Sequence, residues 1–508
     1  MKNRSLFAQS LSAQIFCGFL IAVASLALSS CHSNTYYFYK FPKYTFANRP
    51  KPPSKLAQRV MISYSIDGGL GGLQIVDAKR DIRSNVQNTI QTFPVAGYAG
   101  GNPITIFNFP EEVHGYVYST TSKGTLDVID YSKEASVGPA VKGLTFPNAS
   151  FAIPPTFTRI YAAEESSGQL VIADNTTGAN YALNIPGVYR VAANQGDTVV
   201  IALVRNSNTI YRLVKLNANQ YPTSLAATQA IGAADCEPLN LPVYCMVPVN
   251  TSDSAGNAHS LDHPVGVYFS LDGTTADVLN CGPECGGSAS SITFLQQAPL
   301  NINSIPTGAP DNAAFAVDIP VPGGATVALS DATTLYVAGQ QQMPDGLFTG
   351  YLTSIDLASV KANPANAITG KYSISDGNHS KLLFADDNTL WIGSQYCATG
   401  ERKKLNENYN CLTRFDRGAK TAQVIPNIDP NDPNSTVKYP NTNQNQYYYG
   451  DLTGLCWVQN FHKMYTAYGG QVHVFSTTDG SEIDNQFVTV QGTALDVAYI
   501  DALTNVDN

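Results

Sequence analysis

The chain has 508 residues, of which 44% are hydrophobic and only 14% are charged, and its formal net charge is −9. An acidic chain is a poor nucleic-acid binder, because the phosphate backbone attracts basic surfaces. Its 40 glycines and 28 tyrosines are typical of many short strands joined by turns.

The N-terminal segment predicts export and a lipid anchor. Lys2 and Arg4 precede an apolar stretch at residues 15–28, which is too short for a comfortable membrane span. The next residues, Leu-Ser-Ser-Cys at 28–31, resemble the lipobox of bacterial lipoproteins. That resemblance implies cleavage of a signal peptide of residues 1–30 and lipidation of Cys31. An ordinary cleaved signal and a retained membrane helix are the alternatives.

Residues 31–58 are expected to form a tether. By the same resemblance, His32 after the cysteine favours the outer membrane. Aromatic residues interleaved with lysine at 36–44 suit a membrane interface, and packing along the folded domain is the alternative. The proline-rich segment 49–53 is typical of a semi-extended spacer.

From Val60 onward one pattern recurs eight times: a short run rich in aromatic or β-branched residues, a turn, and a second short run. Such runs are typical of β-strands. The first runs lie at residues 61–64, 116–118, 160–162, 199–201, 277–279, 335–337, 390–392 and 464–466, and the second at 73–77, 126–130, 170–174, 210–214, 292–295, 352–356, 412–416 and 472–475.

Five of the second runs end in aspartate, at Asp77, Asp130, Asp174, Asp356 and Asp416. A short carboxylate at this position can accept a hydrogen bond from a backbone N–H two residues later and so set the next turn. We therefore expect these five residues to be structural.

The repeats predict an all-β fold, a β-propeller of four-stranded antiparallel blades. A unit of this size cannot bury its own apolar faces and must stack on its neighbours. Residues 493–500 form a strand without a hairpin partner of their own. Pairing them with the first repeat would close the ring and remove the exposed sheet edge. We expect eight blades, with seven as the alternative because residues 302–323 could hold one outer strand or two.

The expected domain organisation is a single propeller at residues 59–503, followed by a tail at 504–508. Export permits disulfides. We expect three local disulfides in the mature chain: Cys236 with Cys245, Cys281 with Cys285, and Cys397 with Cys411. Cys456 is the odd cysteine and is expected to be a small buried hydrophobe. A zinc site is the alternative, although the C-x3-C spacing is wider than that of a usual knuckle.

The lengths of the predicted loops point to a binding face. Turns between the first and second strands of a blade stay short, whereas loops between second and third strands and between blades expand. The expanded set shares one face, where insertions mark a recognition surface. The insertions lie at 281–290, 340–350, 397–411, within 247–262, and at 429–450.

The last of these insertions supplies candidate binding residues. Amide and tyrosine side chains that could contact a glycan or protein partner are Asn441, Asn443, Tyr447, Tyr448 and Tyr449. The alternative is a polar loop with one or two of these tyrosines packed against a blade.

Candidates for metal binding or catalysis are few. No cofactor is expected. Asp429, Asn431 and Asp432 are weak calcium candidates, because their spacing misses the helix-loop-helix pattern. The chain lacks the CxxCH, G-x-S-x-G and HExxH motifs and a phosphate loop. Asp262, His263 and Asp451, each just before a predicted inner strand, are weak catalytic candidates, although a polar cap is the simpler role for the first two.

Several segments carry a family resemblance. GYVYSTTSKGTLDVID at 115–130, TLYVAG at 334–339 and TDG at 478–480 resemble the repeats of YVTN-type β-propeller proteins. The segment at 272–287 resembles uncharacterised propeller lipoproteins of acidobacterial type. The resemblance covers roughly residues 58–503 and implies a fold but no catalytic residues.

The leading functional hypothesis is a lipid-anchored propeller of the cell envelope, in the outer membrane, that binds a protein or a glycan through its loop-rich face and binds no nucleic acid. Because one fold hosts many activities, an extracytoplasmic lactonase-like or lyase-like enzyme, metal-dependent or not, is the alternative. Architectural packing in a surface layer is a third hypothesis.

Overall fold

The computed structural model describes residues 58–66, 69–78, 93–121, 123–217, 231–237, 242–306, 314–398, 403–404, 410–425, 449–483, 490 and 492–505. All of them belong to the second of two units into which the chain divides, Ala57–Asn508. Cys31, Asn441, Asn443, Tyr447, Tyr448, Asp429, Asn431 and Asp432 lie outside the described residues. Among the described residues no helix is long and apolar enough to span a membrane.

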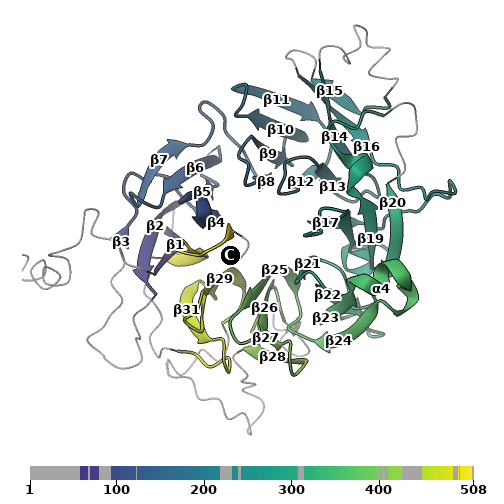
Figure 1. Cartoon of the computed structure of the whole chain (residues 1–508). Coiled ribbons are helices and arrows are strands. Elements are labelled where there is room, and N and C mark those ends of the chain that lie inside the picture. Colours follow the sequence, from purple (N-terminus) through teal and green to yellow (C-terminus); the bar gives the residue numbers. More distant parts are fainter. Residues whose placement is uncertain are drawn as a thin grey trace, which may run out of the picture. The chain divides into compact units, whose positions relative to one another are not determined.

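The second unit is an eight-bladed β-propeller, as predicted, with eight antiparallel sheets arranged around a ring (Figure 1). The first four blades, from inner to outer strand, are β32 (Thr493–Tyr499), β1 (Arg59–Ile66), β2 (Leu70–Asp77) and β3 (Phe93–Pro94); β4 (Pro103–Phe109), β5 (His114–Ser119), β6 (Thr125–Asp130) and β7 (Ala135–Pro139); β8 (Ala149–Ala152), β9 (Arg159–Glu164), β10 (Gln169–Asp174) and β11 (Ala179–Asn184); and β12 (Val188–Ala193), β13 (Val200–Val204), β14 (Ile210–Leu216), β16 (Val243–Pro248) and β15 (Asp235–Glu237).

The remaining four blades continue the same order. They are β17 (Pro264–Phe269), β18 (Thr275–Asn280), β19 (Ser291–Gln296) and β20 (Phe315–Pro320); β21 (Val327–Ser330), β22 (Thr334–Gln342), β23 (Phe348–Asp356) and β24 (Ile368–Ser373); β25 (Asn378–Ala385), β26 (Thr389–Gln395), β27 (Leu412–Asp416) and β28 (Thr421–Ile425); and β29 (Leu452–Val458), β30 (Lys463–Tyr468) and β31 (Gln471–Ser476).

Two blades depart from the predicted four strands. Blade 4 gains β15, whose Cys236 lies opposite Cys245 of β16. Blade 8 has three strands among the described residues, and only an isolated bridge between Phe475 and Glu482 follows β31. The ambiguous region 302–323 contributes one described strand, β20, which is consistent with eight blades.

The ring closes through the last strand of the chain. Residues Val60–Ser65 of β1 pair antiparallel with β32, so the two ends of the unit share blade 1. Arg59 holds the closure. Its guanidinium pairs with the Asp501 carboxylate (Nη2–Oδ1 2.6 Å) and with Glu134 of blade 2 (2.8 Å). Both ion pairs are largely shielded from water, since the three side chains are 7–20% exposed.

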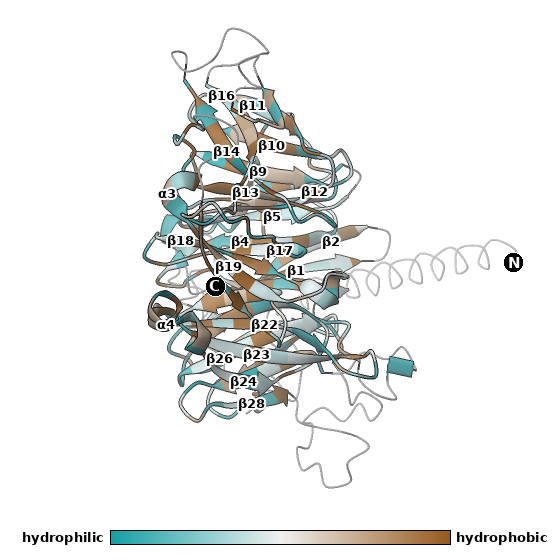
Figure 2. Ribbon diagram, turned by 90° about the vertical axis from the view of Figure 1, so that its right-hand side faces the viewer, coloured by the Kyte–Doolittle hydropathy of each residue, from teal (hydrophilic) through white to brown (hydrophobic). Residues whose placement is uncertain are grey.

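The core lies between neighbouring blades, where apolar side chains of adjacent sheets interdigitate. Between blades 1 and 8, for example, Val60 and Ile62 belong to the same buried cluster as Cys456 and Tyr465. Cys456 is a free, buried cysteine, as predicted. Figure 2 shows the resulting alternation of hydrophobic strands and polar connections.

Two short helices mark one face of the ring. Helix α3 (Gln297–Leu300) follows β19 and helix α4 (Leu357–Ala362) follows β23, and both lie along the left-hand edge of Figure 2. They share this face with the short turns between inner and second strands, because the Leu357 N–H donates to the Thr333 carbonyl of such a turn. We call it the short-loop face.

Candidate binding face

The opposite face carries the connections between second and third strands and between blades, and we call it the loop-rich face. Long connections also lie on the short-loop face, at 297–314 between β19 and β20 and at 357–367 between β23 and β24, so the expected difference in loop length holds only for the turns between first and second strands.

The described connections of the loop-rich face include residues 205–209, 261–263, 281–290, 321–326, 343–347, 374–377, 396–398 and 449–451. The predicted insertion within 247–262 does not lie wholly on this face, because Asp253 and Ser254 line a cavity together with Leu271 and Asp272 of a short turn. The predicted insertion at 340–350 is mostly strand, because the ladder between β22 and β23 continues to Gln342 opposite Phe348 and leaves a loop of residues 343–347.

Disulfides confine two of these loops. Cys281 and Cys285 enclose the short 3-10 helix η3 (Gly282–Cys285), and Cys397 is bonded to Cys411. The third predicted pair, Cys236 with Cys245, also forms, but it links β15 to β16 at the outer edge of blade 4. All three predicted disulfides are therefore present, and two of them serve the loop-rich face.

Asp262 joins the connection between blades 4 and 5 to the loop at 281–290. Its Oδ2 accepts hydrogen bonds from the backbone N–H groups of Ser288 (2.7 Å) and Ala289 (2.8 Å), and its Oδ1 lies 2.8 Å from His263 Nδ1. Burial raises the pKa of Asp262, but the hydrogen bonds outweigh it and hold the pKa below its ordinary value. A Cβ at Gly287 would lie 1.9 Å from Asp262 Oδ1, so this close approach requires glycine.

Glu284 joins blade 5 to blade 6. Its carboxylate accepts hydrogen bonds from the Gln340 backbone N–H (3.0 Å), from Gln340 Nε2 (2.9 Å) and from the Thr326 hydroxyl (3.0 Å). Burial raises the pKa of Glu284 despite these bonds. Gln340 Oε1 in turn accepts from the Gly377 N–H of the connection to blade 7 at 2.9 Å, so the bonding continues to the next blade.

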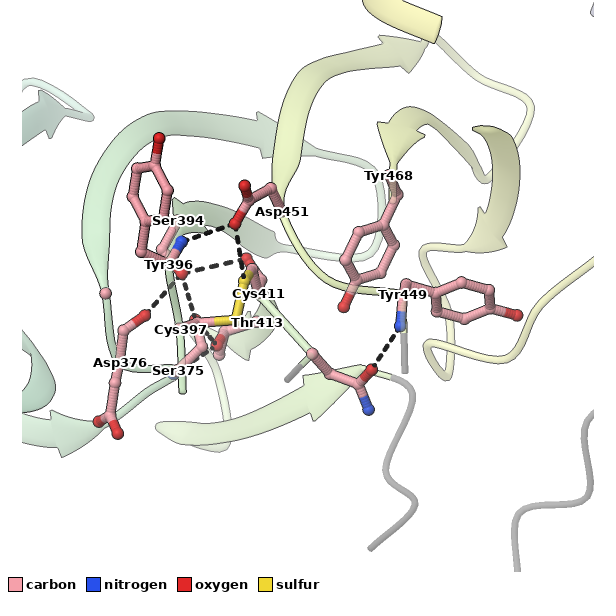
Figure 3. The surroundings of a disulfide bond; sticks show 12 residues. Ser375, Asp376, Ser394, Tyr396, Cys397, Cys411, Thr413, Tyr449, Asp451 and Tyr468 are labelled. Carbon is pink, nitrogen blue, oxygen red and sulfur yellow. Dashed lines mark hydrogen bonds between the residues drawn. A yellow bond between two sulfur atoms is a disulfide. The ribbon is translucent and has the colours of Figure 1, made fainter. Parts of the chain in front are cut away.

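Asp451 joins blade 8 to blade 7. Its Oδ1 accepts the backbone N–H of Tyr396 at 2.6 Å, beside the Cys397–Cys411 disulfide (Figure 3). Tyr396 has a positive φ of 57°, a left-handed conformation that is unfavourable for a bulky residue. Its side chain is nevertheless 71% exposed. The chain thus holds an aromatic ring at the surface in a strained conformation.

Tyr449, the one described member of the predicted tyrosine set, packs inward. Its hydroxyl donates to Glu482 Oε2 at 2.8 Å, and its ring centroid lies 4.1 Å from that of His473. The Tyr449 N–H donates to Asn410 Oδ1 at 3.1 Å. This placement matches the alternative in which a tyrosine of the loop packs against its blade.

The predicted catalytic residues do not come together into one site. Asp262 and His263 contact each other before β17, while Asp451 precedes β29 of blade 8. His259 lies apart from His263, with its ring stacked on Phe315 at 3.7 Å. Within the described ranges, no group of three or more His, Cys, Asp or Glu side chains could hold a metal ion.

A cavity of about 450 Å³ lies on the loop-rich face and is lined by residues of blades 4, 5, 6 and 7. This volume is within the range of ligand pockets. The cavity combines three rings, three cationic groups, one carboxylate and several amides and hydroxyls. Its lining residues are Tyr189, Arg190, Arg205, Val265, Cys281, Glu284, Cys285, Thr326, Gln340, Phe348, Gly377, Asn378, Tyr396, Ala398 and Lys403.

A larger cavity of about 630 Å³ lies between blades 5 and 6 and includes residues of the short-loop face, such as Leu271, Asp272 and Lys361. Its ionised rim residue Asp272 serves a local turn, since Oδ1 accepts from Thr274 N–H and from two hydroxyls. We favour the smaller cavity because charged side chains, three aromatic rings and inter-blade hydrogen bonds converge there.

The sequence located the insertions at 281–290 and 397–411, which contribute to the cavity, but it did not identify most of the cavity residues. Tyr189, Arg190 and Arg205 belong to blade 4, which carries none of the predicted binding residues. Tyr396 directly precedes a predicted disulfide cysteine, and this was the one available signal. The others are brought together only by the ring closure of the fold.

The chain matches no protein-family model and no curated protein sequence. Similar solved structures include a dihydro-heme d1 dehydrogenase, NirN, in complex with DHE, which is 13% identical over 88% of this chain and 75% of that chain, with a TM-score of 0.49. The apo AztD protein from Citrobacter koseri is 11% identical over 87% of this chain and 97% of its own, with a TM-score of 0.44.

A putative 6-phosphogluconolactonase from Bacteroides fragilis is 11% identical over 74% of this chain and 96% of its own, with a TM-score of 0.40. At these identities and TM-scores, none of the three proteins bears on the ligand or the activity of this chain.

Proposed function

We propose that this protein is a lipid-anchored β-propeller of the cell envelope that binds an envelope partner, a glycan or a protein, through its loop-rich face. The anchor is Cys31 and the compartment is the outer membrane, as the N-terminal sequence predicts. The described unit supplies the binding surface and the tether supplies reach.

One observation carries the proposal. Side chains and backbone groups connect the loops of consecutive blades on one face: Asp262 to Ser288 and Ala289, Glu284 to Thr326 and Gln340, Gln340 to Gly377, and Asp451 to Tyr396. Loops fixed in this way lose little conformational freedom on binding, which favours affinity. The fixed loops surround the cavity, so the face is both concave and pre-organised.

The enzymatic hypothesis is the weaker one. Asp262 and Asp451, two of its three candidates, already accept hydrogen bonds from the backbone of neighbouring loops. A carboxylate used in this way positions a loop, and its remaining contacts do not form the nucleophile, base and orienting group of a catalytic site.

The proposal is tested by blocking one face at a time. Pro344 is exposed in the loop between β22 and β23, and Gln195 is exposed in a turn of the short-loop face. The full chain in detergent, as Pro344→Cys or Gln195→Cys, is coupled to a bulky polyethylene glycol maleimide. The buried Cys456 should not react. Each protein is then used to capture material from native envelopes.

We expect the unmodified protein and the Gln195→Cys conjugate to retain the same partner and the Pro344→Cys conjugate to lose it. Retention by both conjugates, or loss with the Gln195→Cys conjugate alone, would contradict binding through the loop-rich face.

A further inference from the structure

We propose that the cavity on the loop-rich face binds an acidic sugar, a pyranose that carries a carboxylate, as part of an envelope polysaccharide. The inference rests on the proposed function and names its ligand class. Three features of the cavity support it: a fixed aromatic surface, an excess of cationic groups, and neutral hydrogen-bonding groups between them.

Tyr396 provides the aromatic surface. A bulky residue with positive φ stores strain, and such residues persist where surrounding bonds enforce them. Here the Asp451 carboxylate accepts the Tyr396 N–H at 2.6 Å, and the next residue is held by the Cys397–Cys411 disulfide. The ring gains no burial from this strained arrangement, because it is 71% exposed. Its remaining use is contact with a ligand, and a tyrosine ring offers an apolar face with a polar tip.

The cationic groups are Arg190, Arg205 and Lys403, all of which line the cavity. Arg205 is partly neutralised by Glu165 (Nη2–Oε2 2.9 Å) and lies over the Tyr189 ring at 4.4 Å. Arg190 Nη1 donates to the Val265 carbonyl at 2.6 Å, which is a neutral group, and within the described part of the chain no carboxylate forms an ion pair with Arg190.

The one carboxylate among the lining residues does not cancel this charge. The carboxylate oxygens of Glu284 accept three hydrogen bonds, from Thr326 and Gln340, and burial raises the pKa of Glu284. In a chain with a formal net charge of −9, a cavity with three cations and one buried acid attracts anions. The planar guanidinium of Arg190 has the geometry that suits a carboxylate.

Neutral amide groups and two further rings in the cavity also favour a sugar as the ligand. Asn378 is exposed at the cavity and Gln340 lines it, and amides both donate to and accept from hydroxyl groups. Tyr189 and Phe348 add two more rings. An isolated inorganic anion would use the cations but not the rings, whereas an acidic pyranose would use both.

The test uses uronate trisaccharides as probes. Galacturonate, glucuronate and mannuronate trisaccharides, and the methyl ester of each, are titrated into the full chain in detergent by isothermal calorimetry. The ester keeps the ring and removes the charge. We expect at least one of the three acids to bind, its ester to bind about tenfold more weakly, and its affinity to fall as salt concentration rises.

Matched variants locate the site. Tyr396→Gly removes the ring and accepts the left-handed backbone, and Arg190→Gln removes one cation; each should weaken the binding about tenfold. Lys361→Gln, the control variant, removes an exposed cation from α4 on the short-loop face. It should bind like the wild type. Equal binding of acid and ester, or binding unchanged in both Tyr396→Gly and Arg190→Gln, would overturn the inference.

Failure of the inference can be told from failure of the proposed function. If none of the three acids binds while the Pro344→Cys conjugate still loses its envelope partner, the acidic-sugar ligand is wrong and binding through the face stands. Capture of a protein alone by the loop-rich face has the same meaning. If the conjugates show no face-dependent partner, the proposed function itself fails.

Discussion

Single residues in this protein act mostly by fixing turns. Four of the five aspartates predicted to be structural accept backbone N–H groups two or three residues later: Asp130 from Ser132, Asp174 from Thr176, Asp356 from Ser359, and Asp416 from Gly418. Asp262 and Asp451 use the same chemistry across longer distances in sequence. A carboxylate that accepts a backbone N–H group fixes the loop that carries this group.

Asp277 differs from these aspartates. It is buried, with 1% of its surface exposed, and one of its two carboxylate oxygens, Oδ1, accepts no hydrogen bond. Burial raises its pKa to about 7. Between the ordinary value of 3.8 and about 7, the folded protein therefore keeps a proton that the unfolded chain has released. The free energy of unfolding consequently falls as the pH rises through this range.

Asp277→Asn should remove this penalty. Relative to the wild type, the variant should become more stable as the pH rises from 4 to 8, by a difference on the order of 1 to 4 kcal/mol above pH 8. Urea unfolding at several pH values measures it. A wild-type advantage that is constant with pH would show that Asp277 is ionised in the folded state.

At the residue scale, the sequence was informative where chemistry is local. An aspartate at a strand end and a cysteine pair four residues apart can be recognised without the fold. Tyr396 could not, because its strain and exposure depend on Asp451, 55 residues away, and on the orientation of a neighbouring blade.

At the level of single strands, the sequence predicted where strands occur better than where they end. Strand positions were predictable from composition, but β22 and β23 extend beyond the predicted strands through Gln340–Gln342, and β15 was not expected at all. Both features depend on pairing with the neighbouring strand, β22 with β23 and β15 with β16. A sequence pattern specifies the strand type more reliably than its ends, because tertiary pairing decides where a ladder stops.

The Cys397–Cys411 disulfide should be important for the order of the face. Its loss in Cys397→Ser/Cys411→Ser should destabilise the protein by about 3 kcal/mol and increase amide hydrogen exchange at residues 396–398. The matched control, Cys236→Ser/Cys245→Ser, removes a disulfide between two outer strands. It should lower stability without changing exchange at 396–398, and equal exchange in both variants would contradict a specific role.

The whole molecule depends on ring closure between β1 and β32. The repeat pattern made this closure predictable, since a single C-terminal strand needs a blade. The Arg59 contacts to Asp501 and Glu134 were not predictable, because they join residues 442 and 75 positions apart with no shared motif.

Asp501→Asn should weaken that closure. It leaves a shielded guanidinium with only one carboxylate, and we expect a loss of about 1 to 3 kcal/mol in the free energy of unfolding. Lys133→Gln breaks a solvent-exposed ion pair with Asp130, in which the lysine is 67% exposed, and should change stability by less than about 1 kcal/mol. Urea denaturation of both variants compares them, and equal losses would argue against a closing role for Asp501.

We propose that the N-terminal segment attaches the protein to the envelope. Cys31→Ser should abolish incorporation of a fatty-acid analogue and release the protein from the membrane fraction, because the lipid supplies the membrane affinity. Labelled cells that are fractionated by centrifugation provide the measurement. Membrane retention of the unlabelled variant would point to a retained helix instead.

Hydroxyl-radical footprinting of the protein, in its native envelope and after purification, tests whether the loop-rich face binds a partner. Tyr396 is 71% exposed on the loop-rich face, and Leu271 is 56% exposed on the short-loop face. We expect the envelope to protect Tyr396 from oxidation and to leave Leu271 as reactive as in the purified protein. Equal oxidation of Tyr396 in both samples, or protection of Leu271 alone, would contradict it.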